Sequence, residues 1–190
     1  MVQKTRFLKG RNIFLRPLLA DDVEGDYLQW FNDEEICRGN SHHVIPHTKE
    51  KILNYIRHAQ TTSNEFILAI ALNENGKHVG NIALQNIDLV YRSADLTIII
   101  GDRSSWGKGY GSEAAGLLVN HGFNAMNLHR ISCATFDTNI AMKKLALALG
   151  MKEEGRRLEA AYKEGKYVDV IEFGMVKLDY EKQRKKNKSE

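Results

Sequence analysis

Two observations predict a mixed α+β fold (α/β mixed) for this chain of 190 residues. Segments of strand-like and helix-like periodicity alternate along most of the sequence, which favours helices packed on a sheet. The first half also contains a hairpin pattern, in which Asn75 and Gly76 separate two apolar runs, so some strands must be antiparallel. The length and the hydrophobic share of 43% suit one domain with a sizeable core, which we expect over residues 1–180.

The first half is expected to contain three strands and two helices. Apolar runs predict the strands at residues 13–19, 65–72 and 78–87. Acidic residues in the first turn predict a helix over 20–33. Thr48 is a suitable N-cap for an amphipathic helix over 48–60, whereas residues 41–47 lack periodicity and are expected to form a loop.

The second half is expected to contain three strands and two helices. The strands are predicted at residues 93–101, 129–136 and 166–178. The first helix follows residue 112 and buries one face, made of Ala114, Leu117, Leu118, His121 and Ala125. The second helix covers 139–150 and ends at Gly150.

Charge and composition argue against several classes of protein. The net charge of +3 is concentrated near the C-terminus, where we expect residues 181–190 to form a flexible basic tail. No aromatic residue interrupts the basic run at 182–188, which argues against nucleic acid as a partner. No apolar run is long enough to cross a membrane, and the N-terminus has no secretory signal pattern. Cys37 and Cys133 lie far apart, which favours a reducing, cytoplasmic location.

Three glycines at alternate positions lie between a predicted strand and a predicted helix, in the stretch WGKGYGSEA at residues 106–114. The first N–H groups of a helix lack internal partners and carry partial positive charge, so a glycine turn at this point suits a phosphate. Lys108 would add a full charge. The alternative is a tight turn that uses glycine only for its backbone freedom.

Two familiar phosphate-binding motifs do not fit this stretch. A P-loop requires Ser or Thr after its lysine, where this chain has Gly109. A dinucleotide-binding fingerprint requires glycine at the position of Ser112.

A third pattern fits better. The stretch resembles the acyl-CoA pyrophosphate loop of the GNAT superfamily of N-acetyltransferases, especially the branch that acetylates ribosomal proteins and N-terminal amines. The superfamily pattern is Gln or Arg, two residues, Gly, one residue and then Gly or Ala, and it falls on Trp106, Gly109 and Gly111. Trp106 replaces the Gln or Arg, as is usual in this branch. The segment that begins at Asn139 and both ends of the domain are similar to the family too, so the resemblance covers nearly the whole chain.

The resemblance implies a GNAT-like fold and acetyl-CoA as the cosubstrate. The expected sheet is mostly antiparallel, has about seven strands, splays between the fourth and fifth strands and is flanked by about four helices. The implied cofactor contacts are made by Ile98, Ile100, Gly107, Lys108, Gly109, Gly111, Ser112, Asn139 and Lys144. Asn139 would also cap the helix that it opens, and Lys144 could equally be a solvated helical lysine.

The resemblance also implies acetyl transfer to a primary amine. Because a free alkylammonium has a pKa near roughly 10.4, a base or a water chain must remove its proton before attack. The candidates for the catalytic residues are Asp95, Tyr91, His43 and Asp169, each of which has a plain structural role as its alternative. Relatives carry a proton-donating tyrosine or serine at the positions of Ala146 and Met142, so no general acid is assigned.

The sequence leaves the acceptor open between a protein N-terminus and a small-molecule amine such as a polyamine or an amino sugar. The missing general acid keeps a second function class open, an acyl-CoA-binding sensor with little or no turnover. Pro46 argues against a helix that would present His43 and His47 to one metal, so no metal is expected. We allow for a homodimer.

Overall fold

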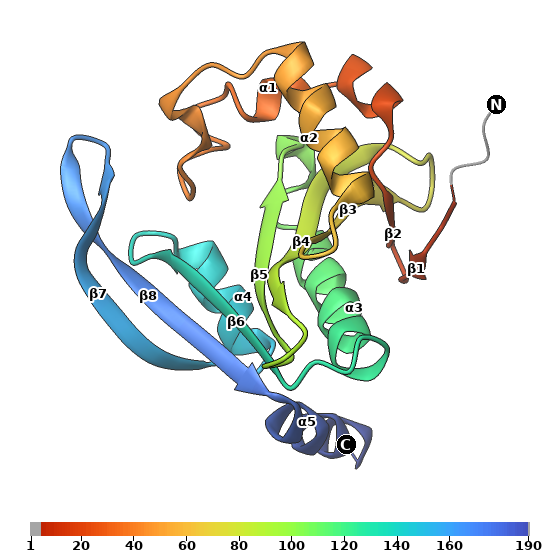
Figure 1. Cartoon of the computed structure of the whole chain (residues 1–190), viewed down its shortest axis with the longest axis vertical. Coiled ribbons are helices and arrows are strands. Elements are labelled where there is room, and N and C mark those ends of the chain that lie inside the picture. The colour runs from red at the N-terminus through yellow and green to blue at the C-terminus, as the bar shows by residue number, and fades with distance from the viewer. Residues whose placement is uncertain (1–4, 190) are drawn as a thin grey trace.

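An eight-stranded sheet runs through the computed structural model, which describes residues 5–189, with residues 187–189 as backbone only (Figure 1). The strand order is β1-β2-β3-β4-β5-β6-β8-β7. The strands are β1 (Leu8–Lys9), β2 (Ile13–Pro17), β3 (Phe66–Leu72), β4 (His78–Asp88), β5 (Ser93–Ile100), β6 (Arg130–Phe136), β7 (Lys152–Lys163) and β8 (Lys166–Val176). This mixed architecture confirms the predicted fold class.

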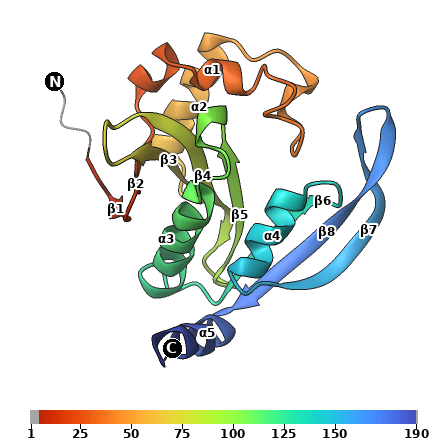
Figure 2. The same cartoon turned by 180° about the vertical axis from the view of Figure 1, so that it is seen from behind.

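Helices cover both faces of the sheet. The α-helices are α1 (Tyr27–Trp30), α2 (Lys49–Thr61), α3 (Tyr110–Asn124), α4 (Ile140–Ala148) and α5 (Lys177–Ser189), and the 3-10 turns are η1 (Ala20–Glu24), η2 (His42–Val44) and η3 (Arg103–Ser105). In Figure 1, α2 lies in front of β3 and β4, and the opposite view in Figure 2 brings α3 to the front. The predicted N-cap of α2 is confirmed, because Thr48 Oγ1 accepts a hydrogen bond from Lys51 N.

The sheet opens between β5 and β6. These are the fourth and fifth of the predicted strands, at residues 93–101 and 129–136, so the opening lies where the family resemblance predicted it. These two strands are parallel and pair only where Ser93–Asp95 lie beside Arg130–Ser132. The other pairings described are antiparallel, and β4 stays paired with β5 as far as Ile100. The edge of β5 that faces β6 is therefore free of a neighbouring strand beyond Asp95.

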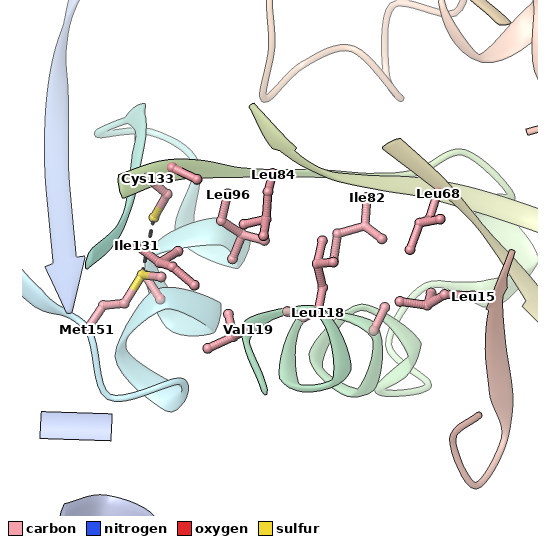
Figure 3. Close-up of a cluster of buried hydrophobic side chains, with 14 of the residues drawn as sticks. Leu15, Leu68, Ile82, Leu84, Leu96, Leu118, Val119, Ile131, Cys133 and Met151 are labelled. Atoms are coloured by element: carbon pink, nitrogen blue, oxygen red, sulfur yellow. Dashed lines mark hydrogen bonds between the residues drawn. The ribbon is translucent and has the colours of Figure 1, made fainter. Parts of the chain in front are cut away.

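Alternation along the strands gives each face its own core. The core under α3 contains Leu68, Ile82, Leu84 and Leu96 from the sheet, together with Leu118 and Val119 of α3 (Figure 3). The core under α2 contains Ile67, Ala69 and Ala83 from the intervening positions of β3 and β4. Figure 3 also shows Cys133 Sγ facing Met151 Sδ at 3.6 Å, at the β6 end of the first core.

A buried polar network joins the sheet to η1. Arg16 and Asp22 form an ion pair with 2.6 Å between Nη2 and Oδ1, and both side chains are almost fully buried. His78 Nδ1 lies 3.7 Å from Asp22 Oδ1, and its Nε2 lies within hydrogen-bond distance of Gly80 O and Asn81 Oδ1. Burial would raise the pKa of Asp22, but the hydrogen bonds from Arg16 and the field of His78 lower it below its usual range.

Two expectations about the elements need correction. The helix predicted over 20–33 is interrupted, because Gly25 takes an extended conformation between η1 and α1. The edge strand β7 carries a charged, exposed pattern without clear alternation, so periodicity did not indicate it. The tail over residues 181–190, which we expect to be flexible, lies within α5, which is helical through Ser189, and Glu190 lies outside the described residues.

Contacts with α3 explain the helical C-terminal segment. The Tyr180 ring stacks on Phe123 with 4.9 Å between ring centroids, and Tyr180 Oη donates a hydrogen bond to Asn120 Oδ1 at 2.8 Å. Arg184 donates to the same Asn120 oxygen at 2.7 Å. Basic composition alone does not reveal these partners, because they come from a helix about 60 residues away. No helix in residues 5–189 is long and apolar enough to cross a membrane.

Candidate active site

The glycine loop after β5 has the backbone geometry that the sequence predicted for an anion site. Gly107 has φ +72° and Gly109 has φ +79°, a left-handed conformation that disfavours side chains with a Cβ. A Cβ built on either glycine would meet nothing within 4 Å. Space is therefore open beside both glycines, which line the cleft described below.

The start of α3 supplies donors to that space. Gly109 is the N-cap, and the bond from Glu113 N to Gly109 O, at 3.0 Å, closes the first turn. The N–H groups of Tyr110, Gly111 and Ser112 precede this bond and belong to the turn that lacks intrahelical acceptors. Because α3 has 15 residues, its dipole adds partial positive charge at the same point.

Side chains before the loop hold it against β5. Trp106 Nε1 donates to Ile100 O at 2.8 Å, and Ser105 Oγ donates to Asp102 Oδ2 at 2.6 Å. Partial burial would raise the pKa of Asp102, but hydrogen bonds from Ser105 and Ser104 lower it below its usual range. The tryptophan that departs from the family pattern thus braces the turn through its indole N–H.

Backbone groups of β5 face the open edge of the splay. Gly101 N donates to Val79 O next to β4, and successive N–H groups along a strand point to opposite edges. The N–H groups of Ile98 and Ile100 therefore point away from β4, toward the gap between β5 and β6. This direction is the one that the family resemblance implied for both residues.

A cleft of about 1060 Å³ connects these features. It reaches both faces of the sheet through the splay, because Ile82 and Leu96 of the α3 core line it together with Ile67 and Ala83 of the α2 core. Seven predicted cofactor residues line it, namely Ile98, Ile100, Gly107, Gly109, Gly111, Ser112 and Asn139. The side chains of Lys108 and Lys144 are exposed, and neither residue is part of the lining.

Asn139 has the predicted capping role and a second contact. Its Oδ1 accepts from Met142 N at 3.1 Å, which caps α4, and its Nδ2 donates to Gly39 O at 3.3 Å. The loop that contains Gly39 is thereby held against the start of α4. Met142 also lines the cleft, and Ala146 is fully buried, so neither can donate a proton from its side chain.

The four predicted catalytic residues lie outside the lining of the cleft. Asp95 accepts hydrogen bonds from Ser132 Oγ at 2.7 Å and from Asn86 Nδ2 at 3.0 Å, where β5 and β6 still pair. Tyr91 is exposed in the β4–β5 turn, and His43 is exposed in η2.

Asp169 forms an ion pair with Arg156, with 2.6 Å between Asp169 Oδ2 and Arg156 Nη1. Hydrogen bonds from Glu159 N and Arg156 hold the pKa of Asp169 below its usual range. The structure thus brings none of the four together.

Other ionisable side chains line the part of the cleft beneath α2. The sequence indicated the histidines of the loop before α2 as a lesser possibility for acceptor contact or base duty, but it did not indicate Tyr55. His42 and His47 come from the loop before α2, and Tyr55 comes from α2 itself. Partial burial, with the nearby charges of His47 and Lys51, lowers the pKa of His42 below its usual range. Burial, with a smaller effect of Glu65, raises the pKa of Tyr55 to about 12. Adjacent histidines look alike in sequence, and only the fold separates His42 from His43.

No group of three or more His, Cys, Asp or Glu side chains able to hold a metal ion occurs in the part of the chain that the structure describes.

Comparison with known proteins gives a consistent assignment. Residues 12–152 match the family described as "Acetyltransferase (GNAT) domain". The uncharacterized N-acetyltransferase p20 of Bacillus licheniformis is 30% identical over 59% of this chain and 62% of that protein. The probable N-acetyltransferase YjcK of Bacillus subtilis is 26% identical over 78% of this chain and 84% of that protein.

Solved structures share the fold. The spermidine N-acetyltransferase of Vibrio cholerae, crystallised in complex with CoA and spermine, superimposes with a TM-score of 0.80. That match covers 89% of this chain and 98% of the other, at 21% sequence identity. The chain therefore belongs to the GNAT acetyltransferase domain family, which confirms the family that its glycine loop predicted.

Proposed function

We propose that the protein is an acetyl-CoA-dependent N-acetyltransferase that moves the acetyl group to a primary amine by direct attack on the thioester. The observation that carries this proposal is the cleft that passes through the splay between β5 and β6, with the glycine loop on one side and the α2 face on the other. The thioester and the amine can then approach each other from opposite faces of the sheet.

The residues at the glycine loop fit the diphosphate of acetyl-CoA. Two left-handed glycines border open space, and three first-turn N–H groups of α3 point to the same end of the helix. The N–H groups of Ile98 and Ile100 suit the oxyanion that forms when the amine attacks, because donors already in place need no rearrangement. The C–S bond then breaks and the CoA thiolate leaves.

His42 is our candidate for the general base. It lines the cleft beneath α2, and its lowered pKa keeps it neutral at pH 7, so it can accept the proton that the amine must lose. The predicted bases Asp95 and Asp169 are already engaged with Ser132 and Arg156 away from the lining.

The acceptor class stays a primary amine, on a small molecule or a protein N-terminus. The matched family and the spermidine N-acetyltransferase fold neighbour support amine acetylation, while the ribosomal-protein branch and a homodimer stay predictions. Both cysteines are buried and unpaired, which supports the predicted cytoplasmic location.

The test is transfer of labelled acetyl groups from acetyl-CoA to a panel of amines and peptides, followed by identification of the product. We expect at least one N-acetylated product and release of free CoA. Tight binding of CoA without transfer to any amine would instead identify a sensor, the alternative function class.

The adjacent histidines provide a matched test of the base. His42→Gln should lower kcat at least tenfold and remove the lower pKa from the pH–rate profile, whereas His43→Gln should leave both unchanged. Equal effects of the two substitutions would exclude His42 as the base.

A further inference from the structure

The part of the cleft beneath α2 is lined by more cationic than anionic side chains. Its charged lining residues are Glu35, Arg38, Lys51, Lys163 and Glu164, to which His42 and His47 add two titratable rings. Lys51 lies in the first turn of α2, on the opposite face of the sheet from the core under α3. Lys51 is therefore placed on the α2 side of the sheet, away from the diphosphate site at the start of α3.

Both carboxylates of this lining already have cationic partners. Glu35 Oε2 lies 2.7 Å from Arg103 Nη1, and Glu164 Oε1 lies 3.3 Å from Arg38 Nε. All four side chains are partly exposed, so the pairs add little stability. Arg103 also pairs with Asp33 at 2.6 Å, so this group of three keeps one negative charge, whereas the Arg38–Glu164 pair is neutral. A ligand with several ammonium groups would find no carboxylate here without a competing guanidinium.

The two lysines of the lining have no carboxylate partner among the described residues. Lys163, at the end of β7, donates through Nζ to Cys37 O and to Asn40 O, both at 2.9 Å. These acceptors are neutral carbonyls, so the positive charge of Lys163 is not cancelled. The positive charge of Lys51 acts within the cleft, because it contributes to the lowered pKa of His42.

Lys49 offers an internal comparison. It is also in the first turn of α2, but it pairs with Glu24 at 2.5 Å and does not line the cleft. The uncompensated charge is thus a property of the residues that face the cleft and not of this helix turn in general.

We propose that the natural acceptor is a primary amine that also carries an anionic group, a carboxylate or a phosphate, which binds at Lys51 and Lys163. This inference rests on the proposed N-acetyltransferase activity and narrows its substrate class. It separates this chain from a polyamine enzyme, because a polyamine would bring further positive charge toward two lysines that already lack counter-ions.

The test compares acceptors that differ only in the charge at the end remote from the amine. One series is 4-aminobutyrate, butylamine and 1,4-diaminobutane, and a second is the C-terminally amidated dipeptides Ala-Glu-amide, Ala-Gln-amide and Ala-Lys-amide. We expect kcat/KM to fall at least tenfold from the anionic to the cationic member of the preferred series. Equal values, or preference for the cationic member, would overturn the proposal while leaving the N-acetyltransferase activity intact. Transfer to no member of either series or of the wider amine panel would remove the proposed function itself.

Substitution of the lysines supplies the second measurement. Lys51→Gln and Lys163→Gln should each reduce the ratio of kcat/KM for the anionic over the neutral acceptor at least fivefold, with the KM for acetyl-CoA unchanged. Lys49→Gln should leave that ratio unchanged. A rise in the KM for acetyl-CoA with an unaltered acceptor ratio would assign the two lysines to the cosubstrate and overturn the proposal.

Discussion

Substitution of Gly109 by valine tests whether the loop before α3 binds the diphosphate of acetyl-CoA. The residue has φ +79°, where a β-branched side chain is strained, so folding stability should fall by about 1–2 kcal/mol. The new side chain would occupy the open space beside the first-turn N–H groups of α3. Loss of even one charge-assisted hydrogen bond of about 1.5–3 kcal/mol would weaken acetyl-CoA binding about 10- to 150-fold.

Gly76→Val is the matched control for backbone strain. Gly76 has φ +72° with nothing within 4 Å of its Cβ position, and it lies in the β3–β4 turn, outside the lining of the cleft. Urea unfolding should show similar losses of stability for both variants, whereas isothermal titration with acetyl-CoA should show weakened binding only for Gly109→Val. Unchanged affinity of the Gly109 variant would mean that the loop is only a turn.

Three further predictions concern stability and are measured by urea unfolding. Asp22→Asn should cost about 3–5 kcal/mol, because it leaves Arg16 charged and buried, and a loss below 1 kcal/mol would contradict this reasoning. Burial lowers the pKa of His78 to about 4, so the unfolded chain takes up the proton first as pH falls. The free energy of unfolding should therefore decrease below about pH 6.5, and this group should account for about 2 kcal/mol of the decrease at pH 5. The His78→Gln variant should lose less stability over the same pH range. An equal loss in both proteins would show that His78 is not the group responsible. Asn139→Ala should cost about 1 kcal/mol through loss of the α4 cap, and Asn139→Ser, which retains a capping oxygen, should lose less than the alanine variant.

The sequence alone determined the features that depend on a few neighbouring residues. Left-handed backbone at Gly107 and Gly109 follows from the absence of a side chain, and the caps at Thr48 and Asn139 follow from a side-chain oxygen placed before a helix. The family pattern around these positions then predicted the splay between β5 and β6, which the strand pairing confirms.

Only the tertiary structure decided which side chains face the cleft. His42 lines the cleft and its neighbour His43 does not, and the His42 ring contacts Phe31 edge to face with 4.9 Å between ring centroids. Lys163 meets the carbonyl of Cys37 across 126 positions of sequence. No local pattern encodes such a contact, because it forms only when segments that are distant in the sequence have packed together.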